Sequence, residues 1–190
     1  MSFIFRILSV PAVIVWRHSN YRDRINADVK RFYSVHCPSG KDNMLGQFLY
    51  ELRHVAEFRS LFYYRTGPVW GRVARLPLFY LRIATQLAFG CPRDKLGGGI
   101  FIQHGYCCDV EAESIGEGLW LNQKVTIGWE RDGRPTIGRN VRIGTGANVI
   151  GKIRIGDNVT IGAGTTVVKD VPDNTTVVSQ PARYITKIHN

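Results

Sequence analysis

Residues 136–168 read TIGRNVRIGTGANVIGKIRIGDNVTIGAGTTVV, and this stretch decides the fold. Branched apolar residues recur in it at intervals of six, and Gly directly follows four of them. The repeated positions are Ile137, Ile143, Val149, Ile155, Ile161 and Val167. A second series of small or β-branched residues follows four positions later: Val141, Ala147, Ile153, Val159, Thr165 and Val171. A period of six matches neither a helix nor a flat strand. It is typical of a chain that winds into a prism of short flat sides, with branched residues on the axis and Gly at the corners. The stretch therefore predicts a hexapeptide-repeat β-helix.

The repeat is interrupted on its amino-terminal side. Ile127 precedes Ile137 by ten residues rather than six, and the polar segment 129–135 between them is expected to loop out of the wall. Further back the series slips by one residue and reaches His104. Such irregularities can repair an imperfect repeat, or they can form a concave site on an otherwise uniform wall. We favour a site, because the irregularities flank the only His of the repeat region before the carboxy-terminal tail.

Composition separates the two halves of the chain. Residues 1–95 carry 15 Lys and Arg against 6 Asp and Glu, whereas residues 96–190 carry 10 against 9. The basic half is expected to face an anionic partner or a membrane surface. No nucleic-acid-binding motif accompanies the charge, so nucleic acid is not an expected partner. The four cysteines lack metal-ligand spacing, so we expect no metal and a reducing, cytoplasmic setting.

The segment before the repeat has helical signals. Residues 1–96 are expected to form an α-helical region and residues 97–190 the β-helix with a tail, with the change at the Gly97–Gly99 run. Apolar positions from Met44 to Phe58 recur at three and four, which predicts an amphipathic helix. Residues 3–16 are apolar but too short to span a bilayer. They either pack internally or lie at a membrane interface, and the sequence favours neither.

Four segments together resemble the left-handed β-helix acyl-coenzyme A transferases, and among them the serine acetyltransferase-like group. They are residues 99–106 (GIFIQHGY), 125–138 (VTIGWERDGRPTIG), 161–172 (IGAGTTVVKDVP) and 180–183 (QPAR). The resemblance implies the left hand of the coil, a homotrimer, and acetyl-CoA as co-substrate. It also implies a general base at His104, which suits an alcohol acceptor whose proton must be removed as it attacks a thioester.

The resemblance carries further site residues with it. Asp94 is the only carboxylate near enough in sequence to orient His104. Coenzyme A is expected along the last coils, where small residues leave room for its arm and two cations suit its phosphates. The residues concerned are Gly144, Ala147, Ala163, Thr165, Lys169 and Arg183.

Departures from the serine-specific members shape the prediction of the acceptor. Those members carry Asp where this chain has Gln103, and the loop here holds no His. Arg134 is the one cation placed near the loop to grip a carboxylate, whereas Tyr106 and Trp129 offer flat faces on which a sugar ring can stack. The sequence therefore predicts acetyl transfer to a carbohydrate hydroxyl of a glycan precursor, with peripheral membrane contact through the basic half. Serine O-acetyltransferase is the alternative within the class, and a non-catalytic β-helix scaffold is the alternative outside it.

Overall fold

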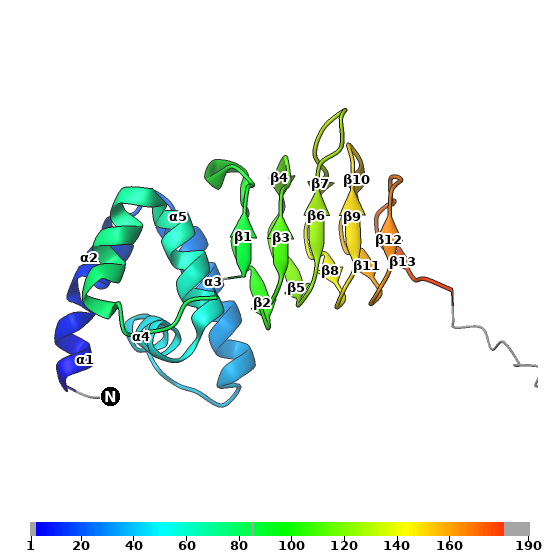
Figure 1. The fold of residues 1–190 in the computed structure, drawn as a ribbon. Helices are drawn as coiled ribbons and strands as arrows, with labels where there is room; N and C mark the ends of the chain where they lie inside the picture. Colours follow the sequence, from blue (N-terminus) through cyan, green and yellow to red (C-terminus); the bar gives the residue numbers. More distant parts are fainter. Residues whose placement is uncertain (1–2, 85, 181–190) are drawn as a thin grey trace, which may run out of the picture.

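The computed structural model describes residues 3–84 and 86–180. A cluster of helices lies at one end of a solenoid of short parallel strands, and the chain leaves the solenoid at the opposite end (Figure 1). The helical elements are α1 (Phe3–Leu8), α2 (Val10–His18), α3 (Arg22–His36), α4 (Met44–His54), α5 (Ala56–Arg75) and two short 3₁₀ helices, η1 (Leu76–Leu78) and η2 (Arg93–Lys95).

The strands stack into three parallel sheets that form the walls of the prism. Sheet A comprises β1 (Leu87–Phe89), β3 (Cys108–Val110), β6 (Thr126–Gly128), β9 (Asn148–Ile150) and β12 (Thr166–Val167). Sheet B comprises β4 (Ser114–Ile115), β7 (Thr136–Ile137) and β10 (Arg154–Ile155). Sheet C comprises β2 (Phe101–Gln103), β5 (Trp120–Asn122), β8 (Arg142–Ile143), β11 (Thr160–Ile161) and β13 (Thr176–Val177).

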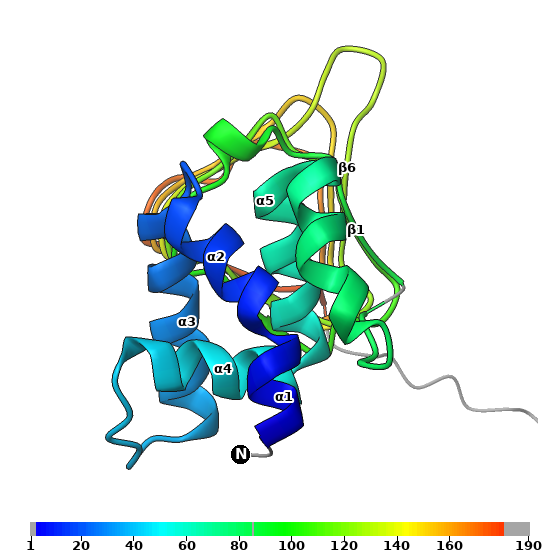
Figure 2. The same cartoon turned by 90° about the vertical axis from the view of Figure 1, so that its left-hand side faces the viewer.

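Three edges join the sheets, and their positions locate the site. Edge CA leads from sheet C to sheet A and comprises residues 104–107, 123–125, 144–147 and 162–165. Edge AB leads from sheet A to sheet B and comprises residues 90–95, 111–113, 129–135, 151–153 and 168–170. Edge BC closes each coil. The segment 129–135 projects from edge AB as predicted, as the loop between β6 and β7 (Figures 1 and 2).

The six-residue period fills the prism axis as predicted. All six members of the first series are buried, and so are five of the second, with Ile153 partly buried. The glycines that follow the first series have a different role from the one expected. A Cβ on Gly138 would lie 2.6 Å from the main chain of Gly156 in the next coil, so these glycines permit close stacking of coils. The left-handed turns of edge BC are made mostly by asparagines, such as Asn140 at φ 53° and Asn158 at φ 57°.

The solenoid starts earlier than the Gly97–Gly99 run. β1 pairs with β3 in sheet A, so the first coil already begins at Leu87. The helical region is joined to this coil by a buried ion pair, in which Arg65 Nε lies 2.5 Å from Asp28 Oδ2. Arg65 also donates to the carbonyl of Leu96, and Asp28 accepts from the amide of Ile100. The clamp fixes where α3 and α5 sit relative to the first coil.

The amphipathic helix expected over residues 44–58 is divided in two. Val55 has an extended backbone (φ −116°, ψ 113°) and separates α4 from α5. The break turns the chain, so α5 starts a new direction with Glu57 in its first turn. A second interruption lies within α5, where Gly67 has φ 83° and Pro68 follows.

Candidate active site

His104 lies on edge CA, directly after β2. Its φ is 59°, in the left-handed region that non-glycine residues seldom adopt, and its side chain is exposed. The turn is closed by the amide of Tyr106, which donates to the carbonyl of His104 at 2.9 Å. Strained backbone of this kind recurs at functional sites, because the surrounding structure must hold it in place. The geometry presents the imidazole at the outside of the corner.

A carboxylate from the helical region lies beside this turn. The amide of Gly105, the residue after His104, donates to Glu57 Oε1 at 3.1 Å. Glycine eases this approach, since a Cβ at position 105 would lie 3.2 Å from Glu57 Cγ and would displace it slightly. Sequence reasoning missed Glu57 as a site residue because 47 positions separate it from His104. The available signals were weak: Glu57 lies on the polar side of the segment 44–58, and the run Glu57-Phe58-Arg59 resembles the helical region of serine acetyltransferase-like proteins.

Asp94 lies elsewhere. It belongs to η2 on edge AB, next to Leu96, which bridges to Ile115 of sheet B. Its carbonyl accepts from Arg24 at 2.9 Å. His104 is on edge CA of the same coil, at a different corner of the prism. The structure thus brings Glu57, rather than Asp94, to the His104 turn, because the fold of α5 and not proximity in sequence determines which carboxylate is close.

Most residues predicted to bind coenzyme A share the edge of His104. Gly144 and Ala147 lie on edge CA two coils away, and Ala163 and Thr165 one coil further. With coils about 4.8 Å apart, these turns are roughly 10 and 14 Å along the edge from His104. Ala147 and Thr165 are buried, so they offer main chain rather than side chain to a ligand.

Of the two cations predicted for the coenzyme, only Lys169 is among the described residues, and it is not on this edge. Lys169 is exposed on edge AB, away from the other four residues. Arg183 lies outside the described residues.

The residues predicted to bind the acceptor divide between two edges. Gln103 and Tyr106 flank His104; Gln103 accepts a hydrogen bond from Trp120 Nε1 at 3.3 Å, and Tyr106 is exposed. Trp129 and Arg134 lie on the loop of edge AB, and Trp129 is 64 % exposed. Within one chain the loop and His104 therefore belong to different corners.

Arg134 is occupied by contacts of its own chain. It donates to the carbonyl of Gly90 at 3.1 Å and pairs with Glu111 at 3.1 Å. These contacts anchor the base of the loop to the preceding coils. Across residues 3–84 and 86–180, there is no group of three or more His, Cys, Asp or Glu side chains able to hold a metal ion.

A stack of aromatic and cationic side chains lies next to Gln103 on sheet C. Arg142 lies 4.3 Å over the ring of Trp120, and Arg31 of α3 approaches the same ring at 5.4 Å. Phe101 contacts it with a centroid separation of 4.6 Å. The stack holds Trp120 in place, and Trp120 donates to Gln103. The side chain of Gln103, predicted to bind the acceptor, is therefore already hydrogen-bonded within the chain.

Comparison with known proteins defines the class. Residues 134–169 match the model of the bacterial transferase hexapeptide family (six repeats). The serine acetyltransferase of Buchnera aphidicola (from Schizaphis graminum) is 30 % identical over 188 residues, covering 91 % of this chain and 69 % of that protein. That of Synechococcus elongatus is 44 % identical over 99 residues, covering 50 % of this chain and 41 % of that protein.

The structure of soybean serine acetyltransferase complexed with serine aligns with a TM-score of 0.63 and 28 % identity. That alignment covers 86 % of this chain and 69 % of the soybean chain. These matches define a hexapeptide-repeat transferase with a left-handed β-helix, as predicted. The chain belongs to the serine acetyltransferase-like family of acyltransferases.

Proposed function

We propose that the protein is an acetyl-CoA-dependent O-acetyltransferase with His104 as general base. The observation that carries this proposal is the shared edge: His104 and the small-residue turns at 144–147 and 162–165 lie along edge CA of a chain that belongs to this family. His104 takes the proton of the acceptor hydroxyl as its oxygen attacks the thioester carbonyl. The carbon–sulfur bond breaks, and the departing thiolate takes the proton back from the imidazolium.

Edge CA suits the pantetheine arm of the coenzyme. An extended arm needs a strip of main chain that it can approach closely, and edge CA offers Gly146 and Gly164, where a Cβ would meet nothing within 4 Å. Small residues at these turns leave that strip uncovered. The coenzyme then lies along the edge with its thioester toward His104.

We infer that serine is the acceptor. The comparisons favour this alternative over the carbohydrate predicted from sequence, since the named relatives are serine acetyltransferases. The sequence argument against serine was the lack of a carboxylate to pair with its ammonium. Glu57 supplies one, held at the His104 turn by Gly105. An ammonium beside it would gain a charge-assisted partner.

A carbohydrate hydroxyl remains the second candidate because of Gln103. Its amide is neutral and bonded to Trp120, and the ring of Tyr106 is exposed beside it. A neutral hydrogen-bonding group with an adjacent flat face is typical of sugar sites.

The divided site supports a homotrimer. Trp129 and the loop of edge AB cannot reach His104 across their own prism, but a neighbouring prism can place its loop against edge CA. Three prisms related by a threefold axis would form three such sites. The trimer predicted from sequence thus provides an arrangement that unites both groups of acceptor residues.

Initial rates of coenzyme A release with acetyl-CoA test the proposal. L-serine is compared at equal concentration with a panel of sugars and with water alone. We expect the highest kcat/KM for L-serine, with O-acetylserine as product. A higher kcat/KM for a sugar transfers the assignment to the second candidate, and release no faster than with water contradicts the transferase proposal.

A further inference from the structure

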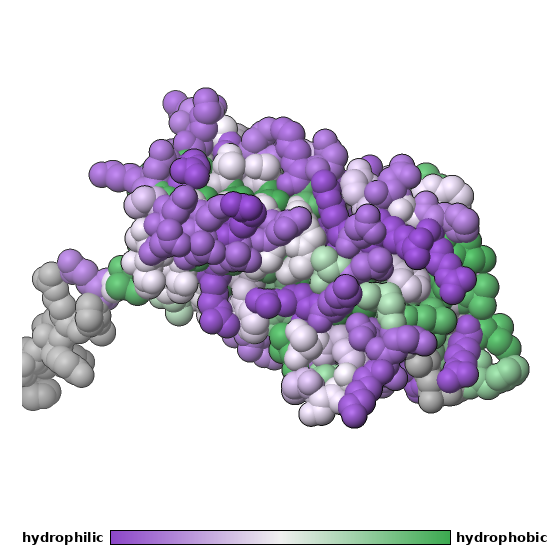
Figure 3. Space-filling view, turned by 180° about the vertical axis from the view of Figure 1, so that it is seen from behind, coloured by the Kyte–Doolittle hydropathy of each residue, from purple (hydrophilic) through white to green (hydrophobic). Residues whose placement is uncertain are grey.

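Exposed apolar side chains gather on the helical end of the molecule. The exposed fractions reach 76 % for Phe3, 76 % for Leu76 and 78 % for Phe79. Seen from behind, hydrophobic surface is concentrated at this end of the molecule (Figure 3). The exposed set is Phe3, Ile4, Ile7, Val10 and Ile14 on α1 and α2, and Val69, Trp70, Val73, Leu76, Phe79 and Tyr80 on α5, η1 and the residues after them. Soluble proteins seldom leave so many large apolar groups in contact with water.

The two halves of this set form one continuous surface, here called the end face. Ile14 of α2 and Trp70 of α5 line the same hollow. Ile4 of α1 and Tyr80 after η1 line another. Viewed from the helical end, α1, α2 and the second half of α5 lie nearest the viewer, with the solenoid behind them (Figure 2).

The end face is basic as well as apolar. No Asp or Glu occurs in residues 1–22 or in residues 58–93, the two segments that supply it. Arg6, Arg17, Arg72 and Arg75 are exposed, and within the described part of the chain none of them forms an ion pair. The face therefore offers unpaired guanidinium groups at the border of an apolar surface.

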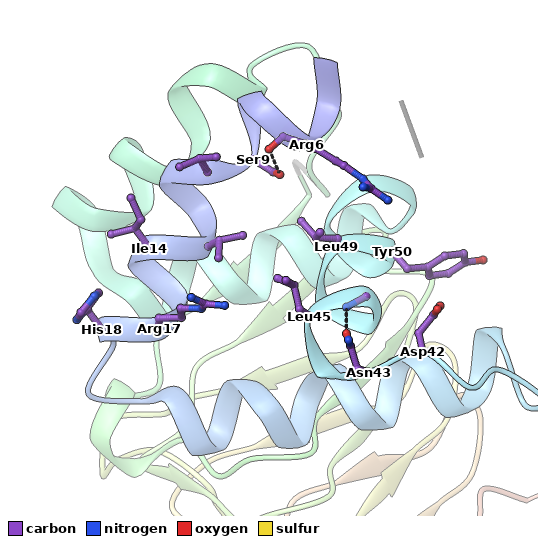
Figure 4. A pocket seen from close by; sticks show the side chains of 13 residues that line it. Arg6, Ser9, Ile14, Arg17, His18, Asp42, Asn43, Leu45, Leu49 and Tyr50 are labelled. Atoms are coloured by element: carbon purple, nitrogen blue, oxygen red, sulfur yellow. Dashed lines mark hydrogen bonds between the residues drawn. The ribbon is translucent and has the colours of Figure 1, made fainter. Parts of the chain in front are cut away.

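A groove continues the end face between α2 and α4. It has a volume of about 680 Å³ and an apolar floor that includes Val13, Leu45 and Leu49. Its lining holds two arginines, Arg6 and Arg17, against one carboxylate, Asp42. Arg6 and Arg17 extend across it toward α4 (Figure 4). Ile14 and His18 line both this groove and the hollow shared with α5. An apolar floor below two guanidinium groups matches an acyl chain below its phosphate.

We propose that the end face docks on an anionic phospholipid bilayer and lies in its interface. Exposed apolar side chains would enter the acyl boundary, and the arginines would contact lipid phosphates. Trp70 and Tyr80 are amphipathic rings of the kind enriched at that depth. Among the described residues no helix is long and apolar enough to cross a membrane, so the contact is interfacial.

Charge distinguishes the bilayer from a second copy of this chain. A twofold contact through the end face would bring together two surfaces of the same positive charge, with no carboxylate in residues 1–22 or 58–93 to neutralise them. A phosphate-rich surface removes that repulsion. The bilayer is therefore the occupant that the face complements in both polarity and charge.

Co-flotation with vesicles tests the proposal. Vesicles of phosphatidylcholine with 30 % phosphatidylglycerol, a composition about as anionic as a bacterial membrane surface, are compared with vesicles of phosphatidylcholine alone. We expect the protein to float with the anionic vesicles, to remain behind with the neutral ones, and to be released as NaCl is raised. Failure to float with anionic vesicles at low salt overturns the proposal.

Three variants identify the surface. Arg6→Glu with Arg17→Glu, and separately Ile7→Ser with Trp70→Ser, are each expected to lower the vesicle partition coefficient at least tenfold. The matched control, Lys152→Glu with Lys169→Glu, makes the same charge change on edge AB of the solenoid and should float like the wild type. Circular dichroism and light scattering accompany each variant. If the control variant loses as much vesicle binding as the other two, the end face is not the membrane-binding surface. If the wild type never floats but self-associates, and the apolar variant abolishes that self-association, the end face binds a second copy of the chain and the proposal is wrong.

Discussion

Backbone geometry brings together His104 and Glu57, the two groups of the proposed site. The imidazole is directed outward by a left-handed turn, and the carboxylate is held by the amide that follows it. The repeat pattern singles out His104, whereas nothing in the sequence spacing connects Glu57 with it. His104 directly follows β2, and Glu57 lies in the first turn of α5. The chemistry at this scale depends on the turn, since a residue with an ordinary φ would aim its side chain elsewhere.

Replacement of the proposed general base should abolish most of the activity. We expect His104→Ala to lower kcat by roughly 10²–10⁴-fold, the usual contribution of a positioned general base. The measurement is steady-state acetyl transfer, with thermal unfolding to confirm an intact fold. His54→Ala, which removes another exposed imidazole, is the control and should retain activity. A fully active His104→Ala variant excludes this role.

Replacement of Glu57 should separate acceptor binding from coenzyme binding. Gln at position 57 retains the oxygen that accepts from Gly105 but loses the charge that would pair with an ammonium. We expect Glu57→Gln to raise the KM for serine about tenfold, equivalent to 1.36 kcal/mol, without changing the KM for acetyl-CoA. Glu117→Gln, an exposed carboxylate on edge BC, is the matched control. Equal changes in both KM values would point to a structural effect instead.

At the scale of elements, two side-chain pairs hold the helices in place, one fully buried and one whose histidine is exposed. One joins α3 to α5 and to the first coil through Asp28 and Arg65. The other joins the end of α3 to α4 through His36 and the fully buried Glu51, with Nδ1 to Oε2 at 3.2 Å. Since α5 carries Glu57, these contacts also determine whether the carboxylate reaches edge CA.

Removal of one partner of the Asp28 pair should be costly. Burial raises the pKa of Asp28 to about 6, against the opposing effect of Arg65, so the carboxylate is held in a strongly desolvated place. We expect Asp28→Asn to lower the free energy of unfolding by about 3–5 kcal/mol, because the Arg65 charge remains buried without its counter-ion. Urea titration measures the loss. Asp23→Asn, on the exposed side of the same helix, should cost little, and a similarly small cost at Asp28 refutes the clamp.

The His36 pair should make stability depend on pH. The hydrogen bond to Glu51 is the main cause that raises the pKa of His36 above 6.5. Because the folded pKa exceeds the unfolded one, the stabilisation is complete below about pH 6.5 and is lost as pH rises through the folded pKa. The difference in unfolding free energy between wild type and His36→Gln should therefore shrink from pH 6 to pH 8.5. If the difference in unfolding free energy is the same from pH 6 to pH 8.5, the His36–Glu51 pair does not contribute to the pH dependence of stability.

For the whole molecule, the prism separates groups that the proposed mechanism brings together. Edge CA carries His104 and the turns proposed to bind coenzyme A, whereas edge AB carries the loop with Trp129. The end face lies beyond both, at the helical end (Figure 2). In a threefold assembly of parallel prisms, three end faces would point the same way, so a bilayer contact would be trivalent.

The assembly is expected to be a trimer. Multi-angle light scattering should give three times the chain mass of 21.4 kDa at micromolar concentration. Mixed assembly offers a second measurement: His104→Ala and Trp129→Ala chains, each weakly active alone, should recover activity when refolded together. The recovery follows because a site with wild-type His104 from one chain and a wild-type loop from another then exists. An active monomer contradicts the arrangement.

The sequence by itself determined the solenoid, its loop and the position of His104. Its six-residue period is a local pattern, and a coil contacts mainly the coils next to it, so no distant contact was needed to read it. The resemblance supplied the acyltransferase class and the left hand of the coil.

Only the tertiary structure decided which groups surround His104. Asp94 is near in sequence but turns away at another corner, whereas Glu57 arrives from a helix whose direction depends on the break at Val55 and on the Asp28–Arg65 clamp. The sequence also left open whether residues 3–16 pack internally or face outward, because an apolar pattern does not show which neighbouring elements cover a helix. Long-range packing determined both the carboxylate beside His104 and the exposed side of residues 3–16. Contacts between segments that are distant in sequence cannot be read from a local period or spacing.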